Sequence, residues 1–137
     1  MKPRFLPMTG ALALAAVLSG PAHAQTEIQW WHSMGGALGE WVNDLAKDFN
    51  ASQTQYKVVP TFKGSYDESM TAAIAAFRAG NAPHILQVFE VGTATMMASK
   101  GAIVPVGKVM SDAGVAFNPA AYVPAVAGYY TAPNGQM

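Results

Sequence analysis

The stretch that decides the fold is residues 84–92, which have the sequence HILQVFEVG. The first six of these residues are nearly all apolar, as is typical of a parallel strand buried on both faces. Glu90 and Gly92 follow at once, and residues 92–100 have the composition of a short Met-rich helix that ends at Gly101. A buried strand is therefore expected to lead directly into a carboxylate and then a helix.

The segment before this stretch predicts a second strand and a second helix. Residues 56–62 (YKVVPTF) have the composition of a strand, and Pro60 within them indicates a bulge or a position near the sheet edge, because proline cannot donate to a ladder. Ser65 and Glu68 have the spacing of a capping box, which marks the start of a helix. This helix is expected to end at Gly80.

The first strand and helix of the domain are predicted from residues 27–49. Residues 27–31 (EIQWW) form a short apolar run typical of a buried strand. After Gly35 and Gly36, five apolar residues recur at helical spacing and are expected to pack in the core. They are Leu38, Trp41, Val42, Leu45 and Phe49.

The alternation of strands and helices predicts an α/β fold with an open, mainly parallel sheet and flanking helices. Further along, residues 105–114 favour a helix and residues 126–131 favour a strand. That strand would run into a turn at residues 133–135 (PNG), which normally leads to another strand. We therefore expect the sequence to be the N-terminal part of a longer protein.

Residues 1–24 have the three regions of a cleavable signal peptide. Lys2 and Arg4 precede an apolar run, residues 9–19, that is too short to span a bilayer, and residues 22–24 (AHA) form a small-x-small cleavage site. The domain is therefore expected to comprise residues 25–137, to be exported to the periplasm and not to remain inserted in the membrane.

Composition excludes several classes of function for residues 25–137. Six basic and eight acidic residues give a net charge of −2, so no basic surface for nucleic acid or a membrane is expected. The chain has no cysteine, and its two histidines in this region lack zinc-ligand spacing. Neither a nucleophile elbow nor a phosphate-binding loop occurs. We therefore expect no catalytic residue, no metal and no cofactor, and the protein is not expected to be an enzyme.

The carboxyl ends of the three predicted strands indicate where a ligand would bind. In open α/β sheets ligands lie beyond these ends, which here comprise residues 31–33, 64–66 and 90–92. Glu90 is predicted to accept hydrogen bonds from the hydroxyls of a polar ligand, although it could also serve only to favour the start of the next helix. Tyr66 is predicted to donate its hydroxyl to a ligand oxygen, although its ring could simply pack against the sheet. Free N–H groups at the same helix start would suit a phosphate or a sugar hydroxyl.

Four further residues at the first strand end are weaker candidates. His32 and Ser33 are expected to be structural more often than ligand-binding. Trp30 and Trp31 could offer a stacking face to a sugar, although at least one of them should point into the core.

Two longer stretches carry a resemblance to a known family. Residues 31–34 (WHSM) with Leu38 and Gly39, and residues 75–100 (AAFRAGNAPHILQVFEVGTATMMASK), resemble the periplasmic glycerol-3-phosphate-binding proteins, which belong to a large solute-binding family that includes maltose-type receptors. The resemblance extends over residues 28–130. In that family a tyrosine in a Gly-x-Tyr element and a glutamate in a Val-(Tyr/Phe)-Glu-Val element contact the ligand. They match Tyr66 and Glu90, with Phe89 in place of the more usual tyrosine.

The resemblance implies a two-lobe receptor of an ABC importer, of which residues 25–137 are the first, incomplete lobe. Its ligand would be glycerol 3-phosphate, and its partners would be the membrane permease and a cytoplasmic ATPase; a monomer is expected. Glycerophosphodiesters are a further possible cargo. The alternatives are a receptor for an oligosaccharide, a secreted phosphodiesterase and a single-domain sensor or adhesion module.

Overall fold

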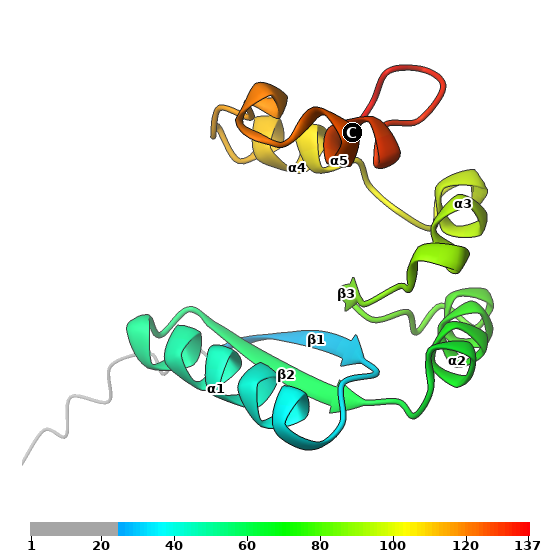
Figure 1. The fold of residues 1–137 in the computed structure, drawn as a ribbon. Helices are drawn as coiled ribbons and strands as arrows, with labels where there is room; N and C mark the ends of the chain where they lie inside the picture. Colours follow the sequence, from blue (N-terminus) through cyan, green and yellow to red (C-terminus); the bar gives the residue numbers. More distant parts are fainter. Residues whose placement is uncertain (1–24) are drawn as a thin grey trace, which may run out of the picture.

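The computed structural model describes residues 25–137, and the predicted signal peptide, residues 1–24, lies outside the described residues. The described part contains one sheet of three parallel strands in the order β2-β1-β3 (Figure 1). Its strands are β1 (Thr26–His32), β2 (Tyr56–Phe62) and β3 (Ile85–Leu86). Helices connect them in sequence order, so the predicted open parallel α/β sheet is confirmed.

The pairing of β1 with β2 is the longest contact in the sheet. It runs in register from Thr26 opposite Tyr56 to His32 opposite Phe62. Helix α1 (Gly36–Ser52) connects the two strands and packs against β2. Near its end, the Asn50 side chain donates to the Val58 carbonyl at 2.8 Å and accepts from the Val58 N–H at 2.7 Å. Among the described strands β2 pairs with β1 alone, so it has the edge position that was one of the two indicated by its proline.

Helix α2 (Tyr66–Arg78) begins at the predicted capping box. The Ser65 hydroxyl accepts the Glu68 N–H at 3.3 Å, and a Glu68 carboxylate oxygen accepts the Ser65 N–H at 2.7 Å. At the other end Gly80 has a φ of 75°, a left-handed conformation that glycine adopts without steric cost. Both predicted ends of this helix are confirmed.

The third strand is shorter and more exposed than the apolar run predicts. β3 comprises two residues, although hydrogen bonds from the His84 N–H to the Gln29 carbonyl (3.1 Å) and from the Gln87 N–H to the Trp31 carbonyl (2.9 Å) extend its contact with β1. Ile85 is 45 % exposed. The expected burial on both faces is wrong for residues 25–137, because no described helix packs closely on β3.

The remaining elements are helical. They are α3 (Glu90–Ala98), α4 (Val106–Asp112), the 3₁₀ helix η1 (Pro119–Ala121) and α5 (Pro124–Tyr129). The predicted helix at residues 105–114 is confirmed, whereas the strand predicted at residues 126–131 is wrong. Pro124 occupies the first turn of α5, where its fixed φ suits a helix, and this outweighs the β-branched and aromatic residues that follow. The turn after it is present, with the Gly135 N–H donating to the Ala132 carbonyl at 2.8 Å.

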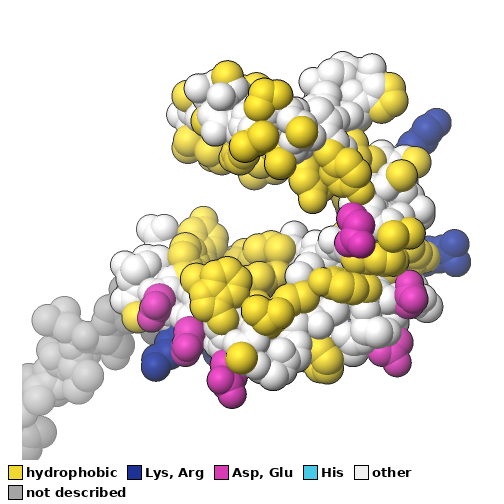
Figure 2. Space-filling model, in the orientation of Figure 1, with side chains coloured by type: hydrophobic (Ala, Val, Ile, Leu, Met, Phe, Trp, Pro, Cys, Tyr) yellow, Lys and Arg dark blue, Asp and Glu magenta, His cyan; other side chains and the backbone are white. Residues whose placement is uncertain are grey.

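The buried core is small, and many apolar side chains face outward. Val42 and Ala46 of α1 are buried, but Trp41 is 61 % exposed, and Leu38, Leu45 and Phe49 are exposed as well. The expectation that these residues pack in the core is confirmed for Val42 and wrong for the other four. Hydrophobic side chains gather where the sheet and the C-terminal helices face one another (Figure 2). Among residues 25–137, no helix has the length and apolar character that a bilayer crossing requires.

Candidate functional site

The carboxyl ends of all three strands lie at one edge of the sheet, as predicted, because the strands are parallel. Hydrogen bonds hold the loops that leave this edge. The Lys63 N–H donates to the His32 carbonyl at 2.9 Å, and the Ser33 N–H donates to the Gln87 side-chain oxygen at 3.0 Å. Gln87 therefore joins the ends of β1 and β3, a role that its place in an apolar run did not predict.

Tyr66 and Glu90 come from different helices but lie at the same edge. The Tyr66 ring stacks on the Phe89 ring, with centroids 5.3 Å apart and planes inclined by 16°. Phe89 is the residue immediately before Glu90, so the stacking ties the start of α2 to the start of α3. The two predicted ligand residues are thus brought to neighbouring positions.

The Tyr66 hydroxyl and the Glu90 carboxylate have hydrogen-bonding capacity that the described protein groups do not use. Tyr66 and Glu90 are exposed, and within residues 25–137 neither the Tyr66 hydroxyl nor the Glu90 carboxylate forms a hydrogen bond with a protein group. Glu90 is the first residue of α3, where a carboxylate is favoured by the helix dipole, but α3 has no side-chain cap. Helix capping by a hydrogen bond therefore does not account for Glu90, and its role in binding stays a prediction.

The start of α2 is less suited to an anion than the sequence suggested. The capping box uses the N–H groups of Ser65 and Glu68, and the carboxylates of Asp67 and Glu68 add negative charge to the first turn. Hydrogen bonds from the backbone and then the side chain of Ser65 lower the pKa of Glu68, so this carboxylate is ionised at neutral pH. A sugar or glycerol hydroxyl fits this helix start better than a phosphate.

Lys63 supplies a positive charge at this edge and covers one aromatic ring. Its ammonium nitrogen lies 3.8 Å from the centroid of the Trp31 ring, a cation–π contact. One face of Trp31 is therefore occupied by a cation and does not offer a stacking surface to a sugar. This contact could not be predicted from the sequence, because nothing in the spacing of the two residues indicates that they meet.

His32 is a packed structural residue, as expected. It is 3 % exposed, its ring lies 6.1 Å from the rings of Trp30 and Phe62, and its Nδ1 accepts the Met34 N–H at 3.3 Å. The Ser33 hydroxyl is also buried, and no group in the described residues pairs with it. Neither side chain is presented to an incoming ligand.

The burial of His32 predicts a dependence of stability on pH. Burial lowers the pKa of His32 below its ordinary value of 6.5. The unfolded chain therefore binds an extra proton as the pH falls through that value, and the free energy of unfolding falls with it. We expect urea denaturation to show lower stability at about pH 5.5 than at about pH 7.5. His32→Asn should weaken this pH dependence, whereas the same change at exposed His84 should leave it in place; equal slopes in the two variants would contradict the prediction.

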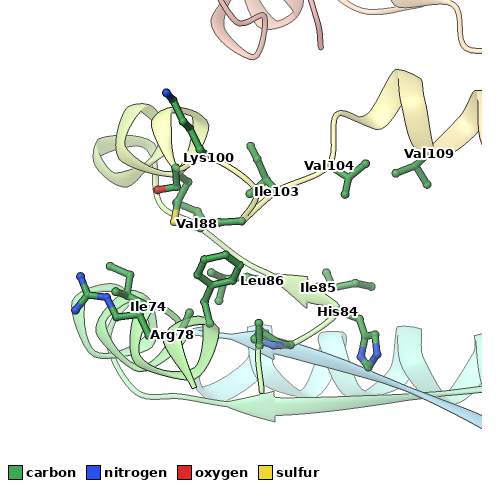
Figure 3. Close-up of a pocket in the computed structure, with 17 residues that line it drawn as sticks. Ile74, Arg78, His84, Ile85, Leu86, Val88, Lys100, Ile103, Val104 and Val109 are labelled. Atoms are coloured by element: carbon green, nitrogen blue, oxygen red, sulfur yellow. The ribbon is translucent and has the colours of Figure 1, made fainter. Parts of the chain in front are cut away.

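A hollow of about 760 Å³ lies away from this edge, along the outer side of β3 (Figure 3). Apolar side chains of α2, β3 and the segment after α3 line it, among them Ile74, Leu86 and Ile103. The charged ends of Arg78 and Lys100 point away from it (Figure 3). A polyol needs several hydrogen-bond partners, so this apolar hollow is a poor site for one.

The acidic and histidine side chains of residues 25–137 form no cluster of three that could hold a metal ion. The site described so far consists of a phenol, a carboxylate and a stacked phenylalanine. These groups can bind a neutral polar molecule through hydrogen bonds and apolar contact.

Comparison with known proteins identifies relatives of this chain. The family model of bacterial extracellular solute-binding proteins matches residues 35–135. The sn-glycerol-3-phosphate-binding periplasmic protein of Escherichia coli (strain K12) is 58% identical over 121 residues, which are 88% of this chain and 27% of the relative. The protein of the same name from Brucella abortus (strain 2308) is 49% identical over 130 residues, which are 95% of this chain and 30% of the relative.

These matches confirm the resemblance found in the sequence. They also show that the chain spans less than a third of the length of the curated relatives it matches. The similarity therefore concerns the segment that carries the sheet, Tyr66 and Glu90.

Proposed function

Because the chain belongs to the bacterial extracellular solute-binding protein family, we propose that it forms the first lobe of a periplasmic receptor for sn-glycerol 3-phosphate. The observation that carries this proposal is the pair of free polar groups, Tyr66 and Glu90, held at the carboxyl edge of a parallel sheet by the Tyr66–Phe89 stack. The names of the Escherichia coli and Brucella relatives support the choice of ligand. Glycerophosphodiesters share the glycerol moiety and are included as possible cargo.

The charges at the edge favour contact with the glycerol part of the ligand. Asp67, Glu68 and Glu90 lie in the first turns of α2 and α3, and a carboxylate repels a phosphate. Ionised Glu90 instead accepts hydrogen bonds from glycerol hydroxyls, and Tyr66 donates to or accepts from either group. The cation at this edge, Lys63, lies over the Trp31 ring, and we assign the phosphate to cationic partners from the second lobe.

The proposal extends to the transport system around the receptor. Residues 1–24 direct export and are removed, and residues 25–137 act in the periplasm as part of a monomer without a cofactor. The loaded receptor delivers its ligand to a membrane permease driven by a cytoplasmic ATPase. Closure of two lobes around the ligand would exclude water and strengthen the hydrogen bonds to Glu90.

A chimera tests the proposed ligand. This chain is fused to the part of the Escherichia coli relative that lies beyond the matched segment, and the relative itself serves as the positive control. We expect isothermal titration calorimetry to show saturable binding of glycerol 3-phosphate and no binding of maltose. Binding of maltose alone would favour the oligosaccharide receptor, and a folded chimera that binds neither ligand would contradict the proposal.

The same chimera separates a receptor from a phosphodiesterase. A phosphodiesterase would convert a glycerophosphodiester to products and would lose this activity on treatment with a chelator. We expect the ligand to be recovered unchanged after incubation, with an affinity that the chelator does not alter. A single-domain sensor or adhesion module would instead require residues 25–137 to act as a stable monomer without a second lobe.

A further inference from the structure

A hydrogen bond from the C-terminal helix reaches the start of α3. The hydroxyl of Tyr129, in α5, donates to the backbone carbonyl of Glu90 at 2.6 Å, although the two residues are 39 positions apart in the sequence. Residues 126–131 favour a strand by their sequence, so this contact of Tyr129 was not expected. The bond ends on the residue that the proposed function assigns to the ligand.

This hydrogen bond links two parts of the structure. Within residues 25–137, it is the one hydrogen bond that joins the C-terminal segment, residues 106–137, to the sheet unit, residues 25–98. The ring of Tyr130 packs edge-on against that of Tyr129, with centroids 5.0 Å apart and planes at 84°, which limits the positions open to the Tyr129 ring. In Figure 1, α5 lies apart from the sheet, and α3 lies to the right of both.

The start of α3 lacks the local support that α2 has. A complete capping box fixes the first turn of α2, but Phe89, the residue that precedes α3, offers no side-chain cap. The first turn of α3 is held by its own backbone and side-chain bonds to the Phe89 carbonyl, from the Gly92 N–H at 3.0 Å and the Thr93 hydroxyl at 3.3 Å. A partner from outside the helix therefore matters more at this helix start.

We propose that Tyr129 is a positioning residue, which fixes the first turn of α3 and thereby directs the Glu90 carboxylate toward the ligand. The proposal rests on the proposed role of Glu90. It also makes the position of Glu90 depend on the position of α5. Movement of the C-terminal segment relative to the sheet would therefore displace the Glu90 carboxylate at the ligand site.

The hydroxyl is tested by Tyr129→Phe, with Tyr130→Phe as the matched control. Both rings are 49 % exposed, but of the two hydroxyls only that of Tyr129 bonds within the described residues. In the chimera, we expect Tyr129→Phe to weaken glycerol 3-phosphate binding about three- to tenfold, the range for one lost hydrogen bond, and Tyr130→Phe to change it less than about twofold. Equal effects of the two changes would overturn the proposal.

A double-mutant cycle distinguishes positioning from a general structural effect. If Tyr129 acts through Glu90, adding Tyr129→Phe to Glu90→Gln should change the affinity less than about twofold, because the group it positions has already been altered. If the loss of affinity in the double variant equals the product of the losses in the two single variants, Tyr129 acts independently of Glu90. That result would overturn the proposal.

A measurement without ligand keeps this proposal separate from the proposed function. In the ligand-free chimera, hydrogen exchange over residues 90–98 should be faster in Tyr129→Phe than in Tyr130→Phe. The two variants should not differ over β1 and β2. Failure of the chimera to bind glycerol 3-phosphate would reject the proposed function and, with it, the ligand-directing role of Tyr129. Unchanged exchange over α3 would reject the positioning contact even in a chimera that binds.

Discussion

Replacing Glu90 by Gln should weaken the binding of glycerol 3-phosphate to the chimera by about ten- to a hundredfold. A hydrogen bond to an ionised group is stronger than one between neutral groups, and Gln presents one acceptor oxygen in place of the two of a carboxylate. Glu90 is exposed and its carboxylate bonds to no other group in the described residues, so the change removes little that stabilises the fold. Calorimetry measures the affinity for glycerol 3-phosphate, and circular dichroism measures the midpoint of thermal unfolding.

Glu40→Gln is the control for this substitution. Glu40 is an exposed carboxylate in α1, outside the first turns of α2 and α3, and it carries the same charge. Its replacement should leave the affinity within about twofold of the unsubstituted chimera, since surface changes away from a site have small effects. If Glu90→Gln and Glu40→Gln bind equally well, Glu90 does not contact the ligand.

The local features of this fold could be predicted from the sequence because short segments determine them. Ser65 and Glu68 form a capping box from four consecutive residues, and Pro60 limits β2 to a bulge or a position near an edge, of which the structure shows the edge position. The order of strands and helices likewise follows from hydrophobic periodicity and from glycine and proline positions. These signals remain valid without knowledge of tertiary contacts.

The features that were missed depend on what covers each element. Trp41 lies on the apolar side of α1, but it is 61 % exposed because nothing in residues 25–137 covers it. The apolar run at residues 84–89 pairs with β1 along a short length, because the chain soon turns into α3. Periodicity indicates that a side is apolar, but it does not indicate which partner, if any, packs on it.

In the candidate site, too, some features follow from the local sequence and others depend on tertiary contacts. Tyr66 and Glu90 were found because each follows a strand end, which is a local property. The Tyr66–Phe89 stack, the Lys63–Trp31 contact and the Tyr129 hydrogen bond join residues between 23 and 39 positions apart, and no spacing rule links them. These three contacts can be recognised only when the arrangement of the helices and strands in space is known.

Gly92→Val should lower the stability of the chimera by about 1–3 kcal/mol, because the neighbouring side chains must shift to admit the added atoms. A Cβ at Gly92 would lie 2.8 Å from the sulfur of Met70, 3.0 Å from the Phe89 ring and 3.1 Å from a Val88 methyl group. Valine favours a helix no less than glycine does, so intrinsic propensity adds no penalty. Thermal unfolding should show a midpoint lower by about 1–3 °C, a small shift because the chimera is several times longer than this chain.

The same substitution should also weaken ligand binding, since the Phe89 ring that must move is the one on which Tyr66 stacks. Gly128→Val is the matched control. Gly128 also lies in a helix, α5, but a Cβ there would have no heavy atom within 4 Å, so neither stability nor affinity should fall. If the two glycine variants unfold at the same temperature, the side chains of Met70, Phe89 and Val88 do not constrain residue 92. If Gly92→Val is destabilised yet binds normally, the Tyr66–Phe89 stack does not organise the site.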